Sequence, residues 1–203
     1  MTTALAERST ARTRSERIYR TLRDRICLLE YPPGARLSEE ELAAEFAISR
    51  TPLRKVLARL EAEGLIASQH GVGTIVTDVD IEELVQVYAL RRALAPLLGR
   101  LDPVPFPPER IARIRAMIEE CDAHAARPDA RAFAALNMAF VQEVNRLTGN
   151  QPLREISERL YIQVARVVVK MMPDLGLAAA AIGDCDAIGH IRRAHISMSF
   201  TRM

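Results

Sequence analysis

Residues 49–64 read SRTPLRKVLARLEAEG, a stretch that carries the start signal, the apolar face and the stop signal of one short helix. Ser49 is a helix-capping residue type, and Pro52 falls in the first turn, where its missing N–H costs no hydrogen bond. Apolar residues recur at helical spacing and predict a buried face: Leu53, Val56, Leu57 and Leu60. Gly64 can end the helix in the left-handed conformation, with Leu65 as the hydrophobic contact that follows.

The opposite face of this helix is cationic. Its side chains are Arg50, Thr51, Arg54, Lys55 and Arg59. Arginine can form two parallel hydrogen bonds with guanine or with phosphate oxygens, and Arg50 and Arg54 lie one turn apart near the helix N-terminus. We therefore predict contacts to duplex DNA from these five residues and from Ser49 at the helix start. Simple solvation is the alternative for any charged helix face.

The flanking sequence supplies the rest of a winged helix-turn-helix. Ser38, with Glu41 three residues later, forms a capping box that predicts a helix ending near residue 47. An apolar pattern predicts an earlier helix over 14–29, before the break at Tyr31-Pro32-Pro33-Gly34. Strands are predicted over 65–68 and 74–77.

The loop between these strands holds two further candidate DNA contacts. His70 at the tip can reach a phosphate or the minor groove, and Gly71 lets the backbone approach closely. Helix, helix, short turn, helix and hairpin together match the geometry of major-groove readers. We assign residues 12–77 to a winged helix-turn-helix and residues 1–11 to a disordered arm.

The remainder of the chain shows only helical patterns. Residues 78–80 are the predicted linker, with Asp80 as the cap of the next helix. Helices are predicted over 81–100, 108–126, 129–148, 152–172 and 184–200. The fold class is therefore mainly α, with three helices and a β-hairpin followed by an all-helical bundle over 81–203 that binds an effector or dimerises.

Composition excludes several other classes. The chain of 203 residues has a net charge of +2, and seven of its 28 Lys and Arg residues fall within the first 25 positions. Cys27, Cys121 and Cys185 are odd in number and far apart, which indicates reduced thiols. No apolar segment resembles a signal peptide or a membrane span, so we expect a cytoplasmic location. Recognised hydrolase and phosphate-binding motifs are missing, so we expect no catalysis.

Several runs of sequence resemble the GntR family of bacterial transcription regulators. They are Pro33-Gly34, Leu37 to Ala43, Ser49 to Leu57, Leu60 to Ile66 and Gly71 to Val76. The resemblance implies a homodimer on a short palindromic DNA operator. It also implies that Arg50 and Arg54 read the DNA, with Thr51 and Gly71 in further contacts. Some members carry an arginine at the position of Glu40, so the operator sequence is expected to differ.

The second half resembles the FCD effector domain of the same family. The matching runs are Leu90 to Leu94, Asn137 to Val141, Leu147 to Asn150, and Gly183 to His195. Many members hold a divalent metal such as zinc with an Asp, a His four residues later and two later His. Here those first two positions are Asn137 and Val141, and only His195 remains, so we predict no metal and no cofactor.

The resemblance suggests a small organic acid as the effector. A buried carboxylate needs a cation or several hydrogen-bond donors, so the candidate residues are Arg91, Arg92, Asn137 and His195. Location of these arginines at a dimer surface is equally compatible with the sequence. The alternatives to a ligand-sensing regulator are a second domain that only dimerises, and a winged helix that binds protein instead of DNA.

Overall fold

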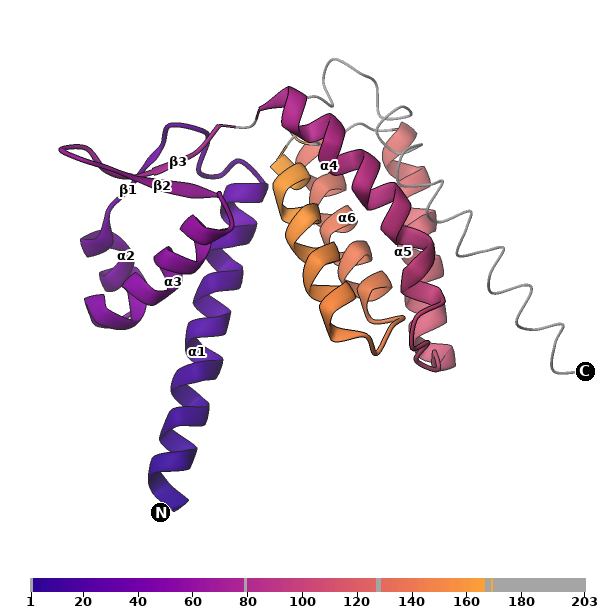
Figure 1. Cartoon of the computed structure of the whole chain (residues 1–203), viewed down its shortest axis with the longest axis horizontal. Helices are drawn as coiled ribbons and strands as arrows, with labels where there is room; N and C mark the ends of the chain where they lie inside the picture. Colours follow the sequence, from indigo (N-terminus) through magenta and orange to yellow (C-terminus); the bar gives the residue numbers. More distant parts are fainter. Residues whose placement is uncertain (1, 79, 127–128, 167–168, 170–203) are drawn as a thin grey trace, which may run out of the picture. The chain divides into compact units, whose positions relative to one another are not determined.

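The chain divides into two compact units, residues 1–79 and 80–203, and each is described by itself. The structure is a computed structural model. It describes all residues except 1, 79, 127–128, 167–168 and 170–203 (Figure 1). The predicted helix over 184–200 and residues 170–172 of the preceding one lie outside the described residues.

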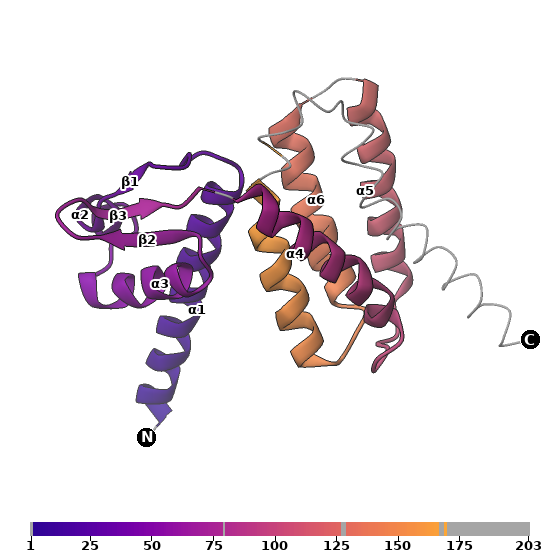
Figure 2. The same cartoon turned by 45° about the horizontal axis from the view of Figure 1, so that its top comes forward.

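The first unit consists of three helices and a small sheet. Helix α1 spans Thr2–Cys27, α2 spans Glu39–Glu45 and α3 spans Arg50–Ala62. The strands are β1 (Arg36–Leu37), β2 (Ile66–Gln69) and β3 (Gly73–Val76), antiparallel and in the order β1-β3-β2. The three helices lie on one side of the sheet, and α3 packs against both α1 and α2 (Figures 1 and 2).

Two local signals predicted from the sequence act where they were expected, whereas Ser49 occupies the N-cap position of α3 without a capping hydrogen bond from its side chain. The Ser38 hydroxyl accepts a hydrogen bond from the Glu41 amide and caps α2. At the end of α3, Gly64 has φ +74°, and the Leu65 amide donates to the Leu60 carbonyl at 3.0 Å. This is the Schellman arrangement, and it turns the fully buried Leu65 into the core.

Two features of this unit differ from the sequence prediction. Helix α1 begins at Thr2, so residues 2–11, which were predicted to form a disordered arm, are helical. No Gly or Pro interrupts residues 2–27, which leaves nothing to stop the helix. Strand β1 was not predicted, because two residues are too few to show an alternating pattern and only pairing with β3 reveals them.

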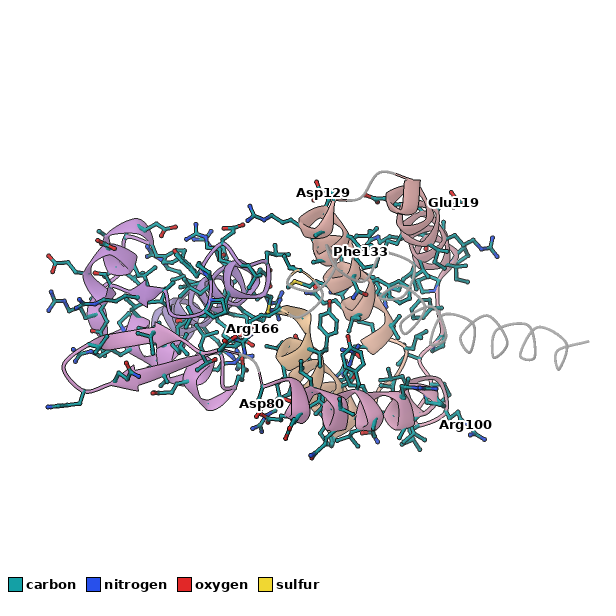
Figure 3. All side chains as sticks on the ribbon, turned by 90° about the horizontal axis from the view of Figure 1, so that it is seen from above. Asp80, Arg100, Glu119, Asp129, Phe133 and Arg166 are labelled. Carbon is teal, nitrogen blue, oxygen red and sulfur yellow. The ribbon has the colours of Figure 1, made fainter. Side chains whose placement is uncertain are left out.

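The second unit is helical. Helix α4 spans Ile81–Leu94, the 3₁₀ helix η1 spans Ala95–Gly99, α5 spans Pro108–Ala126 and α6 spans Ala130–Asn145. A further helix covers residues 151–166. Asp80 caps α4 as predicted, and Figure 3 shows Asp80 and Arg100 at the two ends of the segment formed by α4 and η1. The predicted mainly α class is confirmed.

The predicted helix over 81–100 is wrong in its last part, because Pro96 intervenes. Proline has no N–H for the α-helical ladder and clashes with the preceding turn, so the chain tightens into η1. The core of this unit gathers around Leu98, Phe140 and Leu153. Each described helix of this unit, from α4 to the helix over 151–166, contributes apolar residues to this core.

A tight junction precedes the helix over 151–166. The Gly149 amide donates to the Asp102 carbonyl at 2.7 Å, and the Thr148 hydroxyl donates to the Leu101 carbonyl. A Cβ at Gly149 would overlap an Asp102 carboxylate oxygen, so a larger residue fits here only if the exposed Asp102 side chain turns away. The next residue, Asn150, caps the helix by accepting from the Leu153 amide at 3.0 Å.

Candidate nucleic-acid interface

Helix α3 has the two faces that the sequence predicted. Its buried residues are Leu53, Val56, Leu57 and Leu60. The side chains predicted to contact DNA at its start are all exposed, namely Ser49, Arg50, Thr51, Arg54 and Lys55. Because the apolar face fixes the helix against α1 and α2, the cationic edge is held in one orientation.

The two candidate DNA-reading arginines form ion pairs with the start of α2. Arg54 Nε donates to a Glu39 carboxylate oxygen at 2.9 Å, and Arg50 Nη2 lies 3.6 Å from a Glu40 oxygen. Both arginine side chains stay about two-thirds exposed, at 66% and 61%. The pairs lie at the surface and leave both guanidinium groups accessible to a ligand. Their partners are 10 and 15 positions apart, so no local sequence pattern reveals these pairs.

Arg59 differs from the other cations on α3 because it is engaged within the unit. Its guanidinium lies 3.4 Å from the centre of the Tyr19 ring and donates to Glu16 at 2.8 Å and to Glu63 at 3.3 Å. Burial alone would raise the pKa of Glu16, but the hydrogen bonds and charges of Arg59 and Arg20 lower it. The arrangement joins α3 to α1, so Arg59 has a structural role whether or not it also contacts DNA.

Arg14 is a residue that the sequence analysis did not select. One of its guanidinium nitrogens donates to the carbonyls of Phe46 and Ala47, at 2.9 and 2.6 Å. These carbonyls belong to the end of α2 and to the turn before α3, where backbone acceptors lack helical partners. Ala47 adopts a positive φ of 48° in that turn. Arg14 therefore ties the turn between the two helices to α1.

The hairpin presents its tip to solvent. His70, Gly71 and Val72 are all exposed, and Gly71 has φ +76° in the turn closed by the Val72 amide and the Gln69 carbonyl. Across the sheet, a Cβ at Gly73 would meet the exposed Arg36 side chain at 3.4 Å. Arg36 thus lies beside the hairpin as an additional cation, which was missed because β1 was not predicted.

The helical unit has a pocket next to some of the candidate effector residues. Its lining includes Arg91 and Arg92 from α4 and Val141 from α6. Arg91 is half-buried between aromatic rings, with its guanidinium 4.9 Å from the centre of the Tyr161 ring. The pocket therefore combines an apolar wall with two guanidinium groups, which suits a small anion with an apolar part.

The other two candidate effector residues, Asn137 and His195, are not among the described residues that line this pocket. Asn137 is buried on α6, at 4% exposed, but does not line it, and His195 lies outside the described residues. Within the described part of the chain, no three His, Cys, Asp or Glu side chains form a group that could hold a metal. Because His195 is outside that part, the expected loss of the metal site stays a prediction.

Both parts of the chain match families of known proteins. Residues 14–76 match the family described as "Bacterial regulatory proteins, gntR family", and residues 86–195 match the FCD domain. None of the described helices combines the length and the apolar character that crossing a membrane requires.

Two curated relatives are regulators. A helix-turn-helix transcriptional regulator in an unstable DNA locus of Streptomyces ambofaciens is 36% identical over 141 residues, which cover 68% of this chain and 58% of that protein. A protein of Paenarthrobacter nicotinovorans, named "Probable D-xylose utilization operon transcriptional repressor", is 32% identical over 150 residues, which cover 74% of this chain and 66% of that protein. The match thus spans less than two thirds of either relative.

A solved structure shares the fold. Escherichia coli McbR/YncC superposes with a TM-score of 0.68 at 18% identity, covering 93% of this chain and 98% of that one. The FCD match extends over more than half of the chain, and the gntR match covers the second half of α1, all of α2 and α3, and the hairpin. This chain belongs to the GntR family of bacterial transcription regulators and carries an FCD domain.

Proposed function

We propose that this chain binds a short palindromic DNA operator as a homodimer and regulates transcription from it. The observation that carries the proposal is the exposed edge of α3, where Arg50, Thr51, Arg54 and Lys55 project from a helix fixed by four buried apolar residues. A rigid helix with cations near its N-terminus has the size and charge to enter the major groove. Relatives named as transcriptional regulators support this function over catalysis.

Each part of the interface has its own task in this proposal. Arg50 and Arg54 read base edges through bidentate hydrogen bonds, and Lys55 contacts a phosphate as a point charge. The hairpin lies against the DNA backbone beside the groove that α3 enters. The positive φ of Gly71 gives its tip a compact turn, and Arg36 adds a phosphate contact. A palindrome needs two copies of α3 related by a two-fold axis, which is why we propose a dimer. Because a regulator must reach the DNA that it binds, we also propose a cytoplasmic location.

The helical unit is proposed to sense a small carboxylate. The pocket beside Arg91 and Arg92 supports this, because a desolvated carboxylate needs cationic donors. The effector can change DNA affinity only if it binds the DNA-competent arrangement of the dimer more or less tightly than the other one. A thermal-shift screen of small carboxylic acids tests the pocket, with Arg91→Ala as the variant that should lose the shift. If no acid shifts the wild-type protein, the proposed carboxylate sensing is rejected.

Operator binding is tested by selecting genomic fragments with the purified full chain and footprinting the enriched ones. Replacing Arg50 and Arg54 by alanine should cost about 1–3 kcal/mol for each lost bidentate base contact. Arg115→Ala is a matched control, because Arg115 is an exposed arginine on α5. Equal affinity of the double variant and the control for the enriched fragment would reject α3 as the reading helix. Failure to enrich any fragment would reject the function itself.

A further inference from the structure

The edge of α3 that we propose for DNA contact is flanked by carboxylates. Glu40 is 84% exposed at the start of α2, with an oxygen 3.6 Å from Arg50 Nη2. Glu39 is 33% exposed and accepts a hydrogen bond from Arg54 Nε at 2.9 Å. The two arginines and the two glutamates together carry no net charge. A surface meant simply to attract phosphates would leave these arginines without acidic partners.

Helix stability does not by itself explain both contacts. Acidic residues in the first turn of a helix are favourable, and α2 carries three of them, Glu39, Glu40 and Glu41. Glu41 has that role without an ion pair to α3 among the described contacts. Any of the three acids could support the helix, but only the first two meet the candidate DNA-reading arginines.

The paired carboxylates affect the two kinds of DNA differently. On duplex DNA of arbitrary sequence, the arginines gain only phosphate contacts, and each contact must replace an existing ion pair while a carboxylate faces the polyanion. On the correct sequence, the arginines also gain bidentate hydrogen bonds to base edges, which carboxylates do not offer. The electrostatic cost of the carboxylates is common to both kinds of DNA and cancels in the ratio of the two affinities. The ratio changes because a bidentate contact with a base needs a fixed guanidinium group, which the pairs with Glu39 and Glu40 hold in place before DNA binds, whereas a phosphate contact does not need it.

We infer that Glu39 and Glu40 are specificity-determining residues, which lower the affinity of α3 for DNA that offers phosphates alone. This inference rests on the proposed operator binding. In the free protein, Glu39 also holds the Arg54 guanidinium in one orientation, so that it is already ordered when it meets a base edge.

The test compares Glu39→Gln, Glu40→Gln and the double variant with Glu41→Gln, which removes one acid from the same helix turn. Binding of the full-length protein to a short mixed-sequence duplex is measured over a series of salt concentrations. We expect the double variant to bind about three- to tenfold more tightly at moderate salt, from the loss of two exposed ion pairs. The slope of log K against log salt should become steeper by about 0.9 for each acid removed. Glu41→Gln should change neither quantity appreciably.

The selected genomic fragment provides the second measurement. Its affinity should rise less than that of the mixed duplex, so the ratio of the two affinities falls in the double variant. If the double variant and Glu41→Gln have the same affinity and salt slope, the inference is wrong while operator binding stands. If wild-type protein binds neither DNA even at low salt, the proposed function fails instead. Circular dichroism checks that each variant is folded. Should replacement of the largely buried Glu39 disturb α2, the exposed Glu40→Gln variant alone still tests the inference.

Discussion

Removal of one hydroxyl group tests how α1 and α3 are held together. The Tyr19 side chain is buried, and its hydroxyl donates to a Glu63 carboxylate oxygen at 2.7 Å. Tyr19→Phe deletes this bond and leaves the ring in place beneath Arg59. A hydrogen bond to a charged group contributes about 1.5–3 kcal/mol. Because Arg59 still pairs with Glu63, no carboxylate is left unpaired, and we expect a loss of about 1.5 kcal/mol, the lower end of that range.

The same group predicts a pH dependence. Burial, followed by the hydrogen bond and charge of Glu63, raises the pKa of Tyr19 above its ordinary value of 10.0. The folded state thus keeps a proton that the unfolded state releases, so this stability is complete below pH 10 and falls as the pH rises beyond it. Between pH 10 and 11, one such tyrosine lowers the stability by roughly 1 kcal/mol. The loss should be absent in Tyr19→Phe.

Hydrogen exchange followed by mass spectrometry is the appropriate assay, because it reports on α1 and α3 separately from the helical unit. Protection of α1 and α3 peptides in the wild type and the variant is compared at neutral pH, and urea unfolding is compared at pH 9 and above. Glu63→Gln is the control, since it keeps an acceptor but removes the charge. Unchanged protection in Tyr19→Phe, or an equal loss of stability at high pH in both proteins, would refute this description of the α1–α3 junction.

Two further predictions concern contacts between distant residues. Arg14→Ala removes both hydrogen bonds to the carbonyls of Phe46 and Ala47 and should lower the stability by about 1 kcal/mol. Titration should also show weaker DNA binding. Arg14→Lys should recover only part of the stability and of the DNA affinity, because an ammonium group lacks the planar fork of a guanidinium. Gly149→Ala places a methyl group against the exposed Asp102 side chain and should destabilise the helical unit by about 1 kcal/mol in thermal unfolding. The same change should cost much less in an Asp102→Gly background, which is the comparison to make because glycine at the positive φ of residue 102 also relieves strain; equal costs in the two backgrounds would contradict this junction.

The sequence alone predicts a structural feature correctly where one short segment contains both partners of the interaction that produces it. The apolar face of α3, the Ser38 cap of α2 and the glycine end at Gly64 depend on residues within one or two turns of each other. The exposed arginines of α3 follow from the same spacing, so the candidate DNA face could be predicted together with the mainly α fold. Pro96 is a local signal of the same kind, because its missing N–H accounts for the end of α4 and the start of η1.

Tertiary structure decided every feature that joins distant positions. Arg14 contacts carbonyls that lie 32 and 33 positions further along the chain. Arg59 pairs with Glu16 across 43 positions, and Tyr19 bonds to Glu63 across 44. Such pairs leave no periodic trace, because a charged residue suits solvent, an ion pair or DNA equally well until its neighbours are known. Helical periodicity therefore determined which face of α3 is exposed, whereas packing determined that Arg59 supports α1 and that carboxylates accompany Arg50 and Arg54.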